Sequence, residues 1–180
     1  MRSQTAAALI PPIAVVVAVV VVFAYLIEPV RRLEAATASL LLHLLGVAPE
    51  AVQLRANASL AVYPHGHAAF LAVVTPSCSS LSSLLAVMGL TIFTPRRRQR
   101  RRIAALACAL VCITAGNVVR IAASVMVGLL AGASSLVLFH DWVGSMFAFA
   151  YTLGGYLLML ALLLHTRQTS GRGEAGIHVA

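Results

Sequence analysis

A thiol, a guanidinium and an imidazole occur at three separate points of this hydrophobic chain. Cys78 lies in a polar segment ahead of an apolar run, Arg120 lies within an apolar run, and His140 precedes another. A thiolate is a strong nucleophile, and a nearby cation stabilises it. Arginine donates hydrogen bonds that stabilise an oxyanion, and histidine carries protons near neutral pH. These groups together suit thiol-dependent peptide cleavage or transpeptidation through a thioester.

The composition identifies an integral membrane protein. The chain has 180 residues, of which 61% are hydrophobic and 10% are charged, whereas soluble domains have about 45–50% apolar and about 25% charged residues. Several apolar runs reach the length of about 20 residues that crosses a bilayer. We therefore expect one membrane-embedded domain over residues 1–168 and no separate soluble domain.

The apolar runs predict an all-α polytopic membrane protein with about four transmembrane helices, one interfacial helix and a small extracytoplasmic hairpin. Pro29 is expected to end the first helix. Residues 31–47 are short for a crossing and are expected to lie in the outer interface, with a short crossing as the alternative. The four crossings are expected at residues 9–27, 79–94, 103–130 and 142–164.

Residues 46–75, between the expected interfacial helix and the crossing at residues 79–94, form the segment most compatible with water. Partial alternation of apolar and polar residues predicts a hairpin from residues 52–57 and 59–63. Residues 70–74 predict a further strand that leads into the Cys78 segment. Farther along the chain, residues 132–135 predict a tight turn, and Gly154 with Gly155 predicts a point of close helix packing.

The positive charge sets the expected orientation. The net charge is +8 with no lysine, and six of the thirteen arginines lie in residues 96–102. Such a run in a short loop is typical of a cytoplasmic loop that meets anionic lipid headgroups, and we favour this interpretation over nucleic-acid binding. Residues 169–180, also basic, are expected to form a disordered cytoplasmic tail. Arginine without lysine is typical of a GC-rich bacterial genome.

This orientation brings the three reactive groups to one side of the membrane. Arg120 lies about 26 Å along its helix from the cytoplasmic start, close to the full hydrocarbon thickness of about 30 Å. Cys78 and His140 each precede a helix that runs inward. All three are therefore expected at the outer face.

Each of these residues also has a structural explanation. A lone cysteine is commonly a small buried apolar residue, and an arginine near a helix end reaches for headgroups. His140 and Asp141 can simply begin a helix, with Asp141 as its N-cap. Asn117, one turn from Arg120, either supports the site or joins two helices. Their joint placement at one face favours a site in which Asn117 and Asp141 support the other three.

The remaining cysteines give no sign of a metal or redox centre. Cys108 and Cys112 share one helix face without a histidine or carboxylate at that depth, so packing is favoured over metal binding. No Cys-x-x-Cys motif supports thiol–disulfide exchange. We expect no metal and no cofactor.

Three segments resemble the exosortase/archaeosortase family, whose members are multi-pass membrane proteins proposed to be cysteine transpeptidases. The resemblance runs from about residue 28 to residue 150. The segments are Cys78-Ser-Ser-Leu, Asn117-Val-Val-Arg-Ile and His140-Asp-Trp-Val-Gly. The resemblance implies that Cys78 is the nucleophile, Arg120 the transition-state stabiliser and His140 the acid and base. Ser80 departs from the pattern, since the family often has glycine there.

The resemblance also implies a substrate and a location. The substrate is a secreted protein whose C-terminal sorting signal combines a short motif, a hydrophobic helix and a basic end, cleaved at the outer face of the cell membrane. Membrane lipids are the other expected partner, and nucleic acid is not one. The alternative is a non-catalytic membrane subunit of a surface-protein or polysaccharide assembly system.

Overall fold

The computed structural model of the chain describes the backbone of residues 2–93 and 99–171 and the side chains of residues 19–91 and 99–163. These residues form four α-helices, a 3-10 turn and a three-stranded sheet. The elements in chain order are α1 (Arg2–Leu44), β1 (Val52–Arg55), β2 (Ser59–Val62), β3 (Phe70–Val73), η1 (Pro76–Cys78), α2 (Leu81–Phe93), α3 (Gln99–Asp141) and α4 (Val143–Gly171).

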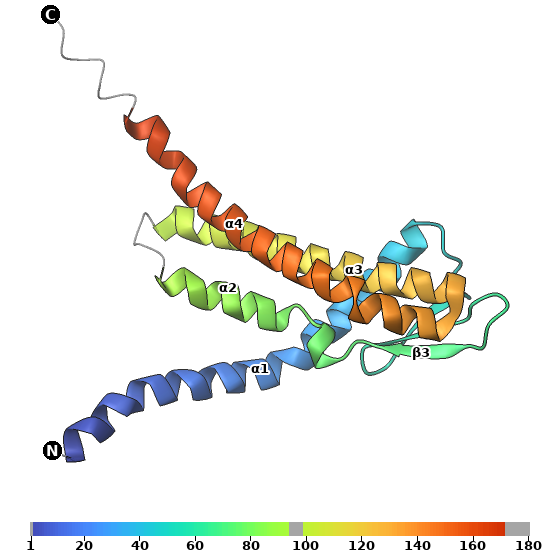
Figure 1. The fold of residues 1–180 in the computed structure, drawn as a ribbon, viewed down its shortest axis with the longest axis horizontal. Helices are drawn as coiled ribbons and strands as arrows, with labels where there is room; N and C mark the ends of the chain where they lie inside the picture. Colours follow the sequence, from blue (N-terminus) through green and yellow to red (C-terminus); the bar gives the residue numbers. More distant parts are fainter. Residues whose placement is uncertain (1, 94–98, 172–180) are drawn as a thin grey trace, which may run out of the picture.

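The helices form an elongated bundle with the sheet at one end (Figure 1). The end of α2 and the start of α3 lie at the opposite end of the bundle, as Figure 1 shows. Among the described residues, α3 and the Val143–Leu163 part of α4 are long and apolar enough to cross a membrane. Helix α2 has 13 residues, about 20 Å of helix. The fold is thus mostly helical, as predicted, and includes a small sheet.

Helix α1 corrects the prediction of two separate helices, because it runs through Pro29 over 43 residues without ending. A proline inside a helix removes one backbone hydrogen bond and crowds the preceding turn. Here Glu28 forms salt bridges of 2.9 Å with both Arg31 and Arg32 across this turn. These ion pairs, together with the packing of the following turns, maintain the helix past the proline.

The second half of α1 packs on the sheet rather than forming a separate interfacial helix. Ala35, Ala38 and Leu42 are fully buried in the core beneath the strands. Small side chains on this face let the strands approach the helix closely. Leu33, Leu40 and Leu44 of the same helix, with Leu45 just after it, face away from this core and are exposed.

The sheet confirms the predicted hairpin and the predicted third strand. Its order is β1-β2-β3 with both neighbouring pairs antiparallel. The turn between β1 and β2 uses left-handed backbone at Asn57 and Ala58, with φ of 59° and 52°. Leu60 of the central strand is fully buried against Ile121 and Val125 of α3. The sheet therefore closes one end of the helical bundle.

A kink at Gly132 confirms the predicted turn and reverses the chain within α3. Gly132 has φ of 83° and ψ of 175°, which are not helical values. A Cβ built at Gly128 would lie 2.9 Å from the side chain of Leu136, so the segment after the kink folds back along the helix. This reversal returns His140 to the level of Arg120.

Glycines let α4 pack tightly against α3. A Cβ at Gly155 would lie 2.7 Å from Ile113, and one at Gly116 would lie 2.8 Å from Tyr151. The predicted close packing is confirmed for Gly155, whereas a Cβ at Gly154 would meet no atom within 4 Å.

The C-terminal end of α4 corrects the predicted tail. Residues 169–171 belong to the helix, which ends at Gly171. The rest of the predicted disordered tail, residues 172–180, lies outside the described residues.

Candidate active site

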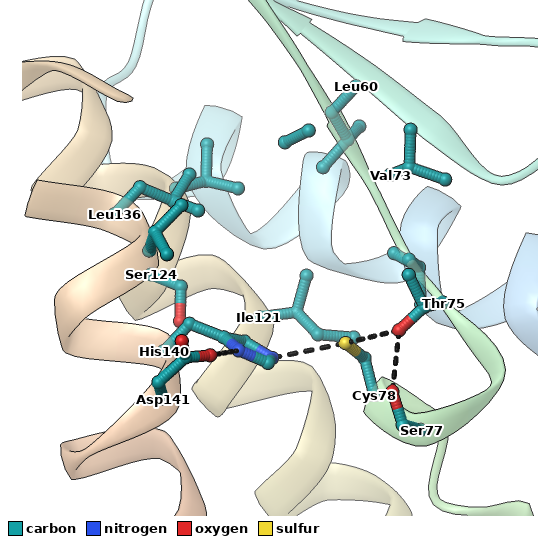
Figure 2. Close-up of a pocket in the computed structure, with 14 residues that line it drawn as sticks. Leu60, Val73, Thr75, Ser77, Cys78, Ile121, Ser124, Leu136, His140 and Asp141 are labelled. Atoms are coloured by element: carbon teal, nitrogen blue, oxygen red, sulfur yellow. Dashed lines mark hydrogen bonds and ion pairs between the residues drawn. The ribbon is translucent and has the colours of Figure 1, made fainter. Parts of the chain in front are cut away.

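Cys78 lies at the end of η1, where the chain passes from β3 into α2. Pro76 begins the turn, a position that suits its fixed φ and missing N–H. The Cys78 N–H donates to the carbonyl of Thr75 over 3.0 Å. Cys78 is 9% exposed, and its sulfur faces His140 (Figure 2).

His140 joins the two other residues singled out in the sequence. Its Nε2 atom lies 3.1 Å from the Sγ atom of Cys78 and 3.1 Å from Nη2 of Arg120. Its Nδ1 atom lies 3.2 Å from Oδ1 of Asp141. Figure 2 shows the line of contacts from Asp141 through His140 to Cys78 and on to Thr75. Five residues, from the turn around Cys78, the interior of α3 and the end of α3, thus meet in one cluster.

These contacts define the protonation state of the histidine. Asp141 accepts only, so Nδ1 carries a proton and donates to it. Arg120 donates only, so Nε2 presents its lone pair to Arg120 and to the Cys78 thiol. While the thiol holds its proton, the ring is neutral and positioned to accept that proton; after the transfer, the protonated ring donates to the thiolate and its charge stabilises it. Once Nε2 is protonated, it can no longer accept a hydrogen bond from Arg120, and the guanidinium is released.

The surroundings of Cys78 favour its thiolate. Burial of the sulfur raises its pKa, but the hydrogen bonds from His140 and Thr75 and the charge of His140 lower it. The result is a pKa of about 7 instead of the ordinary 9.0. The Thr75 hydroxyl lies 2.9 Å from the sulfur and 2.8 Å from the Ser77 hydroxyl. A large fraction of the thiol is consequently ionised near neutral pH.

Arg120 packs closely against Gly144 of the neighbouring helix α4. The arginine is only 6% exposed, and a Cβ at Gly144 would lie 2.9 Å from its Nε atom. Its Nε atom is buried without a hydrogen-bond partner among the described residues. Its contact in the cluster is with His140, and no hydrogen bond joins it to the sulfur in the part of the chain that the structure describes. The arginine therefore influences the thiol through the histidine.

The backbone N–H groups of Cys78 and of the two residues after it already have acceptors. The N–H of Cys78 bonds to Thr75, that of Ser79 to the carbonyl of Pro76, and that of Ser80 to Glu34. Because these N–H groups are occupied, a side-chain donor is the natural partner of a negative charge that develops beside the sulfur. The Arg120 guanidinium, adjacent to His140, is suited to this role.

Glu34 is a buried residue of the site that the sequence reasoning missed. It is 1% exposed, and its Oε1 atom accepts hydrogen bonds from both the N–H and the hydroxyl of Ser80. Its Oε2 atom has no hydrogen-bond partner among the described side chains and backbone. The signal was its spacing from Ala38 and Leu42, which puts the carboxylate on the buried face of α1. The serine that departs from the family pattern is thus tied to this carboxylate.

Asn117 and Asp141, the predicted supporting residues, have different positions. Asn117 is fully buried, and its Oδ1 atom accepts a hydrogen bond of 2.9 Å from the Tyr151 hydroxyl of α4. This contact favours the helix-joining interpretation of Asn117. Asp141 contacts the histidine directly, and hydrogen bonds from Trp142 and Met146 continue the helical pattern past it.

A cavity of about 300 Å³ opens beside the cysteine. Its polar end holds Cys78 and His140, and its walls are mostly apolar. Wall residues come from the sheet (Leu60, Ala72, Val73, Val74) and from α3 (Ile121, Val125, Leu136, Val137). The cavity therefore has room for a few side chains of an apolar peptide next to the sulfur.

The other cysteines lie away from this cluster. Cys108 and Cys112 are exposed on the surface of α3, which corrects the expectation that they pack in a core. No group of three histidine, cysteine or carboxylate side chains that could hold a metal occurs among the described residues.

Comparison with known proteins gives the family. The family model for transmembrane exosortases (Exosortase_EpsH) matches residues 2–164. No curated protein and no solved structure matches the chain. The family match covers all the described helices except the end of α4 and includes every residue of the cluster around Cys78. From this match, the chain belongs to the transmembrane exosortase family.

Proposed function

We propose that the protein is a membrane-embedded cysteine peptidase or transpeptidase that cleaves C-terminal sorting signals of secreted proteins. The observation that carries this proposal is the contact of 3.1 Å between the Cys78 sulfur and the His140 imidazole. A thiol with a pKa of about 7 beside a histidine that can accept its proton is the arrangement that thioester chemistry requires.

In the first step, His140 takes the thiol proton at Nε2, and the Cys78 sulfur attacks the carbonyl carbon of the scissile peptide bond. The carbonyl oxygen becomes an oxyanion. Protonation of Nε2 ends the hydrogen bond from Arg120, so the guanidinium turns to the oxyanion at the moment when the charge appears. Collapse of this intermediate breaks the C–N bond, and His140 returns the proton to the leaving amine. A thioester on Cys78 remains.

In the second step, an acceptor amine or water attacks the thioester. His140 removes the proton from the attacking group, and the Cys78 thiolate leaves. The thiol regains its proton from the imidazolium, which restores the starting cluster. An amine acceptor gives transpeptidation, whereas water gives hydrolysis.

The position of the cluster supports an outward-facing site. Arg102, from the arginine-rich segment, donates a hydrogen bond to the Thr91 carbonyl near the end of α2. Arg120 lies on the same helix about 27 Å farther along its axis. The positive-inside rule assigns the arginine-rich end to the cytoplasm. Cys78 then faces the outer side of the cell membrane, where secreted substrates arrive.

The test compares the processing of secreted proteins in cells that carry Cys78→Ala with that in unaltered cells. Proteins with an apolar helix and a basic end at their C-termini are expected to keep these segments in the variant and to lose them otherwise. Mass spectrometry of C-terminal peptides measures this. Cys112→Ala, which replaces an exposed cysteine far from the cluster, is the matched control and is expected to process normally.

Normal processing in Cys78→Ala cells would contradict the proposal. It would favour the alternative of a non-catalytic membrane subunit that assists surface-protein or polysaccharide assembly. In that case Arg120→Ala would alter assembly while leaving every C-terminus unchanged.

A further inference from the structure

We propose that the substrate segment preceding the scissile bond binds as an added strand along the free edge of β3. This inference rests on the proposed function, since it supplies the way in which a peptide reaches Cys78. It starts from the position of β3, which has one neighbour, β2, and leads directly into the turn that carries the cysteine.

The pairing of β3 shows which of its backbone groups are free. The N–H of Val74 donates to the carbonyl of Ala58, so this is a hydrogen-bonded pair. Hydrogen-bonded and non-bonded pairs alternate along an antiparallel ladder. In the register of β2 and β3, Ala72 with Leu60 is then a bonded pair, whereas Leu71 and Val73 turn their N–H and C=O groups away from β2.

These outward groups have no hydrogen-bond partner in the described parts of the chain. The edge ends at Val74, whose carbonyl accepts a hydrogen bond from Arg31 of α1. Leu71 and Val73 are 57% and 47% exposed. An extended peptide can therefore pair with Leu71 and Val73.

The same edge borders the cavity beside the sulfur. Ala72, Val73 and Val74 line it together with Cys78 and His140. Figure 2 shows Val73 and Thr75 along one strand that descends to Cys78, with His140 across the cavity. A peptide on this edge would direct alternate side chains to the apolar walls and would bring its next carbonyl to the sulfur. The edge and the nucleophile thus form one continuous surface.

The direction of the added strand follows from the chain. β3 runs toward Cys78 and then into α2. A substrate with its own membrane helix after the scissile bond also runs from the sheet end of the bundle toward the membrane. Its segment before the bond consequently lies parallel to β3. Binding of an extended peptide to a free sheet edge is a common mode of recognition, with affinity from the backbone and specificity from alternate side chains.

The test uses vinyl sulfones, to which the Cys78 thiolate adds at the vinyl carbon farther from the sulfone, while the carbon beside the sulfone takes up a proton. A tripeptidyl vinyl sulfone with small apolar side chains places its peptide on the side that precedes the scissile bond. Methyl vinyl sulfone has no peptide. The purified full-length protein in detergent, with Cys108→Ser and Cys112→Ser, makes Cys78 the single thiol, and the two alkylation rates are compared.

The tripeptidyl reagent is expected to react about tenfold faster than the methyl reagent, a difference of about 1.4 kcal/mol. Val73→Pro removes an outward N–H without altering the ladder to β2. It is expected to reduce this ratio about fivefold, as for the loss of about one net hydrogen bond. The rate with methyl vinyl sulfone is measured in the same variant, so that the ratio corrects for any change in the reactivity of Cys78 itself.

Leu54→Pro is the matched control. The N–H of Tyr63 donates to the carbonyl of Ala51, so Leu54 turns its N–H away from β2 at the opposite edge of the sheet. It is 48% exposed, much like Val73, and its substitution is expected to leave the ratio unchanged. Replacing single amides of the reagent by esters should reduce the rate only at alternate positions.

The added-strand proposal would be overturned if the ratio of the two alkylation rates stayed unchanged in Val73→Pro, or if it fell equally in Leu54→Pro. Neither result would contradict the proposed function, because processing in Cys78→Ala cells tests that function separately. Conversely, normal processing in those cells together with a Val73-dependent ratio would leave a peptide-binding edge without the proposed cleavage.

Discussion

The carboxylate of Glu34 accepts a hydrogen bond of 2.9 Å from the backbone N–H of Ser80, a residue 46 positions later in the chain. A second hydrogen bond comes from the Ser80 hydroxyl. Ser80 is fully buried two residues after Cys78. Helix α1 therefore fixes the turn that carries the thiol.

Glu34→Ala is expected to slow substrate processing about tenfold or more, because it leaves a buried N–H without an acceptor at a cost of about 1–3 kcal/mol. Glu34→Gln keeps an oxygen that can accept from Ser80 and is expected to stay within about threefold of the unaltered rate. Alkylation of Cys78 by methyl vinyl sulfone measures the state of the turn. Equal rates of processing and of alkylation in Glu34→Ala and in the unaltered protein would show that this contact does not position the cysteine.

Thr75→Val is expected to raise the pKa of Cys78 above about 7. The variant keeps the shape of the side chain but removes the hydroxyl that lies 2.9 Å from the sulfur. Alkylation at neutral pH should slow and should recover at higher pH, since only the thiolate reacts. Ser77→Ala, which removes a hydroxyl that contacts Thr75 but not the sulfur, is the control. A pH profile that does not move in Thr75→Val would exclude this contribution.

Gly144→Ala is expected to displace the Arg120 guanidinium, because the added Cβ would lie 2.9 Å from its Nε atom. Processing should fall at least about tenfold, because complete removal of one oxyanion donor typically slows an enzyme by more than this. Gly154→Ala makes the same change farther along α4, where the Cβ meets nothing within 4 Å. If both variants process substrate equally well, the position of Arg120 does not limit the reaction.

The local pattern of the sequence was sufficient for the strands and turns. Alternation marked β1, β2 and β3, and the glycine at position 132 marked the reversal that returns His140 to Arg120. Polar residues in apolar surroundings were few enough to single out Cys78, Arg120 and His140, because each carries a desolvation cost there.

Features that depend on contacts between distant segments were not predictable in the same way. Pro29 predicted a helix end, but its local cost is offset by ion pairs and by packing on the sheet. Glu34 was not predicted as a site residue, although its spacing from Ala38 and Leu42 places it on the buried face of α1. The Gly144 contact with Arg120 required knowledge of how α4 lies on α3.

The central claim is that Cys78 is a thiol activated by His140 at the outer face of the membrane. The most direct measurement is the rate at which a membrane-impermeant maleimide labels Cys78 in intact spheroplasts as a function of pH, with Cys108→Ser and Cys112→Ser. Below its pKa the thiol is protonated, so the rate should fall as pH drops through about 7. His140→Ala removes the hydrogen bond and the charge that lower the pKa, so the fall should move to higher pH. Labelling only after lysis would contradict the account. So would a pH profile centred near the ordinary pKa of 9.0 that is the same with and without His140→Ala.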